Sequence, residues 1–161
     1  MRPHDSLSID SDVQTELLAR ARAAAAQAYV PYSGFPVGAA VLAADGSIHT
    51  GCNVENASYG LTICAERVAA TAAVSSGHRQ IIAVAVSAPK VPRTTPCGAC
   101  RQFLNEFQPG ASDMMIILED GGSGEPIWLE ELLPHAFGPR NLDAAPPSDV
   151  SSMPRRDSRG G

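Results

Sequence analysis

Residues 81–88 form an almost uninterrupted apolar run, IIAVAVSA, and this run restricts the possible folds more than any other segment. Strands that are covered on both faces have this composition, because neither face meets water. A strand of this kind needs other elements packed above and below its sheet. The run therefore predicts an α/β fold in which helices lie on the faces of a sheet.

Apolar spacing and turn residues predict the remaining elements. Residues recurring at helical intervals predict helices over 12–29, 64–76 and 97–107, with a brief one over 129–134. Short apolar runs between turn signals predict strands over 35–42, 47–54, 81–88, 114–118 and 127–129. The segment GGSGEP, residues 121–126, is predicted to be a loop. The order of these elements implies one mixed sheet with helices packed on its faces.

Length and charge limit the classes of protein to consider. A chain of 161 residues is long enough for one domain, which we assign to residues 1–140. Residues 141–161, rich in Pro, Ser, Asp, Arg and Gly, are expected to form a disordered tail. The net charge of −5 argues against binding to nucleic acid or to anionic membranes. No apolar stretch approaches the ~20 residues of a membrane span.

The four cysteines are expected to serve metal binding or catalysis. The N-terminal residues lack the apolar core of a secretory signal, so we expect a cytoplasmic, reducing location, where disulfides are rare. Cys97 and Cys100 are three residues apart at a predicted helix start, and Cys64 opens another predicted helix. If the two helix starts converge, three thiolates share a site that both helix dipoles favour. Sulfur ligands and tetrahedral geometry suit one zinc ion per chain.

Two other interpretations of the cysteines are possible. A C-x-x-C pair at a helix start can be a redox dithiol, but that leaves Cys64 and Glu66 without a role. A closed structural site could use Cys52 as a fourth ligand. Cys52 falls within an apolar strand pattern, on the face opposite Asn53, so we interpret it as a buried small side chain. With three protein ligands, the fourth zinc position stays open for catalysis.

Glu66 follows Cys64 by two residues, at the start of an alanine-rich run. Its carboxylate could reach a water at the open zinc position, where zinc lowers the pKa of water to about 7. A carboxylate beside that water can take its proton and pass it on. An acidic residue in a first helical turn is also favoured by the helix dipole, and the two roles are compatible.

In the predicted strand over residues 47–54, period-two alternation places Asn53 and Glu55 on the same face. The two side chains should therefore project side by side.

At this point the residues resemble a known family. CAER followed by PCGACRQ is similar to the zinc-dependent cytidine deaminases. YVPYSGFPVGAAV, GCNVENASYG and ELLPHAFGP look like the small branch of that family, which acts on free nucleosides, so the resemblance covers residues 17–139. It implies a three-layer α/β/α sandwich with a mixed five-stranded sheet, and a homotetramer. His135 departs from the glycine expected in this branch, so the local turn could differ.

The resemblance also implies residue roles. Cys64, Cys97 and Cys100 would hold zinc, and Glu66 would be the catalytic proton carrier. Arg67 would hydrogen-bond the ligand sulfurs, with Gln102 in the same layer around them. Residues implied to bind the substrate, two of them by completing the pockets of neighbouring subunits, are Phe35, Asn53, Glu55, Ala65, Tyr59 and Phe137.

These roles imply hydrolytic deamination of cytidine and 2′-deoxycytidine to the uridines, with release of ammonia. An alternative is a deaminase of a cytosine-containing antibiotic nucleoside that uses the same zinc chemistry. A polynucleotide-editing deaminase is disfavoured by the acidic charge and by the absence of a basic, aromatic-lined pattern. A zinc-stapled interaction module would bind metal without turnover.

Overall fold

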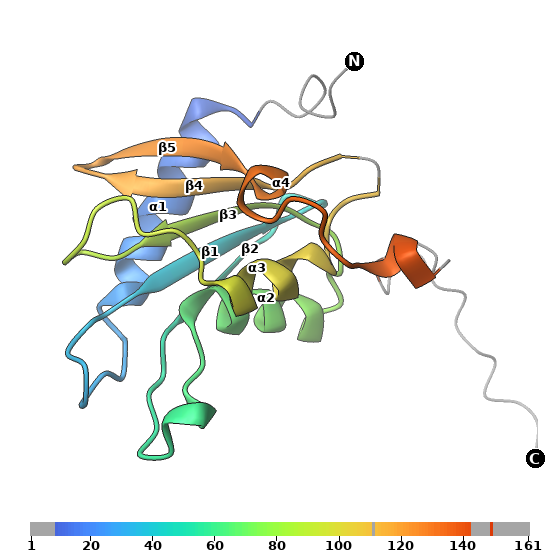
Figure 1. Ribbon diagram of the computed structural model, residues 1–161. Coiled ribbons are helices and arrows are strands. Elements are labelled where there is room, and N and C mark those ends of the chain that lie inside the picture. The colour runs from blue at the N-terminus through green and yellow to red at the C-terminus, as the bar shows by residue number, and fades with distance from the viewer. Residues whose placement is uncertain (1–8, 111, 143–148, 150–161) are drawn as a thin grey trace, which may run out of the picture.

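A mixed five-stranded sheet forms the middle layer of the fold in the computed structural model, which describes residues 9–110, 112–142 and 149 (Figure 1). Its strands lie in the order β2-β1-β3-β4-β5. Only β3 and β4 pair in parallel, while the other neighbouring strands are antiparallel. The bounds are β1 Gly38–Ala43, β2 Ile48–Cys52, β3 Ile81–Ser87, β4 Met115–Asp120 and β5 Ser123–Trp128.

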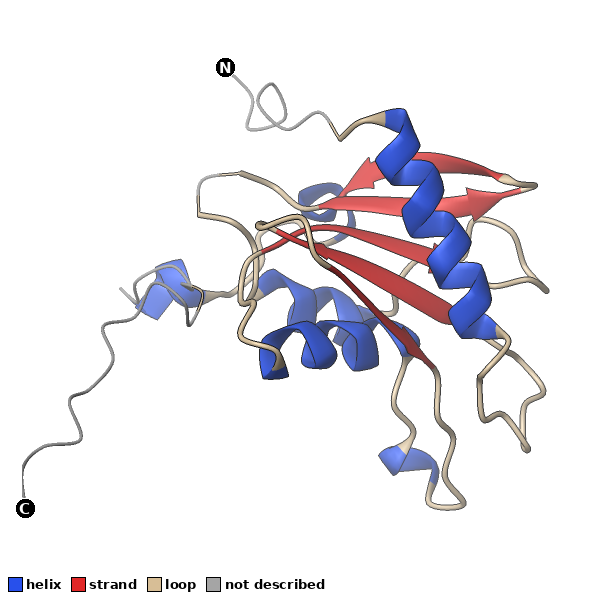
Figure 2. Ribbon diagram, turned by 180° about the vertical axis from the view of Figure 1, so that it is seen from behind, coloured by secondary structure: helices blue, strands red, loops and turns tan. Residues whose placement is uncertain are grey.

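Helices cover both faces of this sheet. Figure 2 shows α1 crossing one face, and α2 and α3 lie on the other. The bounds are α1 Ser11–Ala25, α2 Ala65–Ser75, α3 Gly98–Asn105 and α4 Leu129–Leu132, with 3₁₀ helices at Tyr59–Leu61 and Pro139–Leu142. The predicted α/β class, the mixed sheet and the three layers are confirmed.

Strand β3 is nearly all buried, as its apolar run predicts. Val84 and Val86 pack into the core on the side of α2 and α3. Ala83 and Ala85 pack into the core on the side of α1. Because alternate residues enter opposite cores, the strand needs apolar side chains at every position.

Two glycines on neighbouring strands let helices approach the sheet closely. A Cβ built on Gly38 would lie 2.0 Å from the Ala21 carbonyl oxygen of α1. A Cβ built on Gly51 would lie 2.4 Å from the Ala69 nitrogen of α2. Both neighbours are backbone atoms, which cannot rotate away. These glycines therefore set the distance between sheet and helix on the two faces.

Three predicted assignments are wrong. The segment 121–126 is not a loop, because Gly121 and Gly122, both with positive φ, make a tight turn and Ser123–Trp128 pairs with β4. Leu129, predicted to end that strand, instead begins α4. Helix α1 ends at Ala25 and not at residue 29, because the backbone of Tyr29 pairs with residues 53–55.

The segment from residue 141 was expected to be a disordered tail. Residues 143–148 and 150–161 lie outside the described part of the chain. Asn141 and Leu142 belong to a 3₁₀ helix, and the Asp149 carboxylate accepts a hydrogen bond from the Arg79 amide at 2.6 Å. Within the described ranges, no helix combines the length and apolar character needed to cross a membrane.

Candidate metal centre and neighbouring pocket

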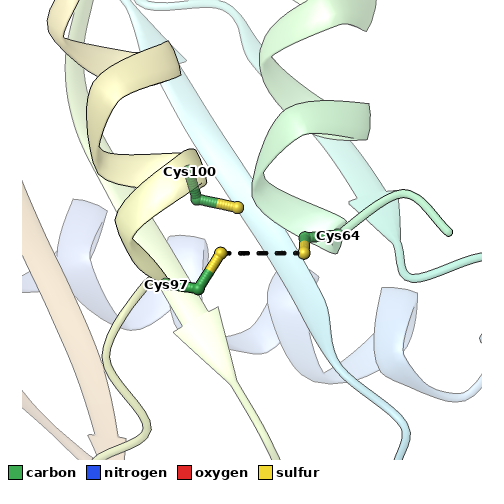
Figure 3. Close-up of side chains that lie close together, drawn as sticks. All are labelled: Cys64, Cys97 and Cys100. Carbon is green, nitrogen blue, oxygen red and sulfur yellow. Dashed lines mark hydrogen bonds between the residues drawn. The ribbon is translucent and has the colours of Figure 1, made fainter. Parts of the chain in front are cut away.

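Three cysteines from the N-terminal ends of two helices meet on one face of the sheet. Cys64 is the residue that caps α2, and Cys97 is the corresponding residue of α3. Cys100 lies in the first turn of α3, and its sulfur points toward the other two (Figure 3). The predicted convergence of the two helix starts is confirmed.

The three sulfur atoms have the spacing that zinc requires. They all lie within 4.8 Å of one another, and the Sγ atoms of Cys64 and Cys97 are 4.0 Å apart. Zinc–sulfur bonds of about 2.3 Å at tetrahedral angles would separate the sulfurs by about 3.8 Å. The donor set therefore fits zinc, with three thiolates supplied by the protein. Cys52 lies elsewhere, since its sulfur contacts the Gln27 carbonyl oxygen near the end of α1.

The thiols strongly affect one another in the metal-free protein. A hydrogen bond from the Cys100 thiol, with smaller contributions from Arg67 and Cys97, lowers the pKa of Cys64 to about 5. The same bond to Cys64, burial and the charge of Glu66 raise the pKa of Cys100. One thiolate therefore forms readily at Cys64, and Cys100 keeps its proton. Cys100 gives up its proton when a cation binds.

Glu66 is buried beside the cysteines, in the first turn of α2. Its side chain is 5% exposed. Burial is the main cause that raises its pKa above the ordinary value, and the negative charge of Cys64 adds to this. A backbone hydrogen bond, and then a side-chain hydrogen bond with Cys100, act in the opposite direction on this pKa. A carboxyl group with a raised pKa can both hold and release a proton near neutral pH.

Arg67 supplies positive charge to the sulfurs. Burial alone would lower the pKa of this guanidinium, but hydrogen bonds and charge interactions with Cys64 and Cys100 raise it. Its Nη2 also donates to the Thr62 carbonyl oxygen at 3.2 Å, which anchors the side chain to the segment before α2. A cation here withdraws negative charge from the thiolates.

Asn53 and Glu55 follow the end of β2 at Cys52, not within the strand as predicted, and both bind the segment before β1. Asn53 accepts a hydrogen bond from the Val37 amide and donates one to the Phe35 carbonyl oxygen, each at 2.9 Å. The Glu55 carboxylate accepts from the Tyr32 amide at 2.9 Å and from the amide and hydroxyl of Ser33. The Ser33 hydroxyl is the main cause that lowers the pKa of Glu55. Two polar side chains thus shape one loop.

A cavity of about 270 Å³ opens beside this loop. Its lining residues are Tyr32, Ser33, Glu55, Tyr59 and Thr62. Tyr59 is 74% exposed, and its ring lies 5.7 Å from that of Tyr32. Ala65 is fully buried at the start of α2, and Phe35 is half-buried. Phe137 is exposed and lies apart from this lining, on the segment after α4.

Sequence reasoning missed the contacts of α3 with the C-terminal segment. Arg101, to which no motif assigned a role, donates to the carbonyl oxygens of Pro96 and Leu132 and to the Thr95 hydroxyl. The Gln102 amide donates to the Phe137 carbonyl oxygen at 2.9 Å. Tyr32 and Ser33 were also missed, although they lie within the YVPYSGF motif. The motif could have pointed to Tyr32 and Ser33. No sequence pattern predicts that side chains of α3 donate to backbone carbonyls of the C-terminal segment.

Comparisons with known proteins agree with this geometry. A family model described as "Cytidine and deoxycytidylate deaminase zinc-binding region" matches residues 11–116. The chain is 48% identical over 131 residues to a cytidine deaminase of Sporosarcina psychrophila, covering 81% of this chain and 95% of that one. It is 47% identical over 128 residues to a cytidine deaminase of Mycobacterium tuberculosis, covering 79% and 92%.

Solved structures resemble the fold as well. The crystal structure of cytidine deaminase from Burkholderia pseudomallei matches with a TM-score of 0.70 and 43% identity, covering 76% of this chain and 97% of that one. The crystal structure of cytidine deaminase from Mycobacterium tuberculosis matches with a TM-score of 0.68 and 44% identity, covering 81% and 99%.

Proposed function

The chain belongs to the cytidine and deoxycytidylate deaminase family, and from this membership and its site we propose that it hydrolyses cytidine and 2′-deoxycytidine to the uridines, releasing ammonia. The observation that carries the proposal is the burial of Glu66 against three cysteines that can hold zinc. An antibiotic nucleoside as substrate is not favoured, since the relatives named above are cytidine deaminases.

In the proposed reaction, Glu66 moves two protons. When bound by Cys64, Cys97 and Cys100, zinc supplies Lewis-acid chemistry that lowers the pKa of water to about 7. Glu66 takes one proton from the attacking water and gives it to N3 of the pyrimidine, while the water oxygen bonds to C4. Glu66 then passes the second proton to the amino group, the C4–N bond breaks, and ammonia leaves. The raised pKa of Glu66 supports this alternation between acid and base.

The other residues of the site bind and orient the nucleoside in this proposal. Asn53 and Glu55 hydrogen-bond the ribose hydroxyls, which fits the opening of the cavity beside Glu55. Phe35 packs against the pyrimidine ring, and the backbone of Ala65 reads the edge of the base together with Glu66. The positive charge of Arg67 stabilises the negatively charged sulfurs.

We further propose a homotetramer in which Tyr59 and Phe137 complete the pockets of neighbouring subunits. Both rings are exposed in the single chain, at 74% and 59%. The thiol ligands suit a reducing cytoplasm, where the enzyme would serve pyrimidine salvage. Residues 1–140 would form the catalytic domain.

A cytidine assay with metal analysis tests the function. Purified protein should contain one zinc per chain and convert cytidine to uridine, followed by the loss of cytidine absorbance and by ammonia release. Glu66→Gln should keep its zinc and lose about 10²- to 10⁴-fold in kcat, because the proton carrier is gone. Glu106→Gln, the same change at an exposed glutamate directly after α3, is the matched control and should keep full activity.

Two results would contradict the proposal. Undiminished turnover by Glu66→Gln would remove Glu66 from the mechanism. Stoichiometric zinc without ammonia release from any cytosine nucleoside would indicate an interaction module in place of an enzyme.

A further inference from the structure

Helix α3 has the proposed zinc ligands at its N-terminal end. One turn later, two of its side chains hydrogen-bond a segment that is distant in the sequence. Gln102 and Asn105 are three residues apart, so they share a helix face. The Gln102 Nε2 donates to the Phe137 carbonyl oxygen at 2.9 Å, and the Asn105 Nδ2 donates to the same oxygen at 3.1 Å. Both lone pairs of one carbonyl are thus bound by side-chain amides from the metal-binding helix.

The contact is closely fitted around Asn105, whose side chain is buried. Gln108 donates to the Asn105 Oδ1 at 2.7 Å, which turns the Asn105 Nδ2 toward Phe137. A Cβ built on Gly138 would lie 2.6 Å from the Asn105 Nδ2, so only glycine allows this approach. The amide of Gly138 in turn donates to the Asn141 Oδ1 at 2.8 Å. The peptide unit that joins Phe137 to Gly138 is therefore held at both its carbonyl and its amide.

The Phe137 ring is nonetheless exposed, at 59%. An aromatic ring that serves the core of its own chain would be buried with its backbone. Here the backbone is held and the ring projects outward. A side chain on a fixed backbone loses less conformational freedom when it binds another surface.

We propose that Gln102 and Asn105 are positioning residues that hold the Phe137 backbone so that its ring is presented to the substrate pocket of a neighbouring copy. The inference rests on the proposed function, in which Phe137 completes that pocket. It gives Gln102 a role different from the one beside the zinc sulfurs that family resemblance implies. Helix α3 would then have two roles. Cys97 and Cys100 at its start would bind the metal of their own chain, and Gln102 and Asn105 in the following turn would hold the Phe137 that enters the neighbour's pocket.

Gln102→Met tests the role, because Gln102 is exposed and its loss leaves the core intact. The variant removes the donor but keeps the length of the side chain. KM for cytidine should rise about three- to tenfold, the equivalent of one hydrogen bond, while kcat changes by less than about twofold and zinc content stays the same. Gln14→Met is the matched control: the Gln14 Nε2 also donates to a backbone carbonyl, that of Ile9 at 2.8 Å, but at the start of α1.

A double-mutant cycle with Phe137→Ala separates positioning from other effects. If Gln102 acts through Phe137, adding Gln102→Met to Phe137→Ala should raise KM no further. A full additional effect in that background, a loss of zinc or kcat in place of the KM rise, or an unchanged KM would each overturn the inference. Absence of cytidine turnover by the wild type would instead overturn the proposed function.

Mixed assemblies test the route between subunits. Wild-type chains are co-assembled with an excess of Glu66→Gln chains that either carry or lack Gln102→Met. Active sites then belong to the wild type, whereas most neighbours are inactive. KM should rise only when the inactive neighbours carry Gln102→Met; an equal KM in both mixtures would place the effect within one subunit and overturn the proposal.

Discussion

At the scale of single residues, the cysteine cluster has a chemical property that is independent of substrate. The pKa of Cys64 lies near 5 in the metal-free protein, lowered by the Cys100 thiol and by Arg67. Since a thiolate is the reactive form of cysteine, Cys64 should be mostly reactive at neutral pH, and its reactivity should fall as the pH drops through 5.

Alkylation of the metal-free protein measures this reactivity. At pH 6–7, iodoacetamide should modify Cys64 faster than Cys52, which lies outside the cluster, and added zinc should protect Cys64 but not Cys52. Mass spectrometry of the digested protein follows both thiols in one sample. Equal rates at Cys64 and Cys52 at pH 6 would contradict the lowered pKa.

Residues of the metal centre could be predicted because they lie close to one another in the sequence within each helix start. Cys97 and Cys100 share one helical turn, and Glu66 follows Cys64 on another. The C-terminal partners of Arg101 and Gln102 could not be predicted in this way. They are backbone carbonyls 31 and 35 residues further on, and only the path of the chain brings them to α3.

At the scale of elements, the packing of α2 on β2 depends on Gly51. A Cβ at this position would lie 2.4 Å from the Ala69 nitrogen and 2.8 Å from the Ala65 carbonyl oxygen. Gly51→Ala should therefore lower the free energy of unfolding by about 1–3 kcal/mol, as overpacking does. Because Cys64 caps α2, displacement of the helix should also weaken zinc binding.

Urea denaturation and zinc titration check this prediction. Thr71→Ala is a suitable control, since Thr71 is exposed on the same helix. If Gly51→Ala proved as stable as Thr71→Ala, the close approach of α2 to the sheet would be wrong.

Strand β2 and the segment after α2 meet through a pair of histidines. The rings of His49 and His78 lie 5.2 Å apart, and the His78 Nδ1 lies 3.4 Å from a carboxylate oxygen of Asp45. Burial, and then the charge of His78, lower the pKa of His49, which Asp45 only partly offsets. As the pH falls below the ordinary histidine pKa of about 6.5, the unfolded chain therefore takes up a proton before folded His49 does.

This contribution to stability should be fully present above pH 7 and should be lost as the pH falls below about 6.5. His49→Gln should consequently lose less stability than the wild type between pH 7.5 and pH 5.5, measured by urea denaturation. Equal losses in the two proteins would exclude His49 as the source.

Element type was easier to predict than element boundaries. The segment GGSGEP has the composition of a loop, and composition alone does not distinguish a loop from a tight turn followed by an edge strand. Pairing of Ser123–Trp128 with β4 decides between them. Likewise Tyr29 continues the helical spacing of α1, but its backbone pairs with residues 53–55.

At the scale of the whole molecule, the apolar run of β3 was enough to predict a layered fold. The assembly of several chains could not be predicted in the same way from one chain. Large apolar side chains remain exposed around the 3₁₀ helix at Tyr59–Leu61, among them Leu61 at 65% and Tyr59 at 74%. Exposed apolar patches of this kind mark contact surfaces. In the proposed homotetramer, this region faces other subunits.

Light scattering should give the mass of a tetramer of 16.8 kDa chains. Leu61→Asp should shift the protein to smaller species, because a charge at an apolar interface is left without water or partner. Its zinc content should persist while turnover falls. A monomeric wild type with full activity would contradict the shared pockets.

The beginnings of α2 and α3 have one further consequence. Helices usually start at a residue whose oxygen accepts a hydrogen bond from the first turn, a bond worth about 1 kcal/mol. Within the described residues, neither Cys64 nor Cys97 makes such a bond with its side chain. Chelation would therefore leave both helix ends prone to fraying, and amide hydrogen exchange at residues 65–67 and 98–100 should quicken together while the sheet stays protected.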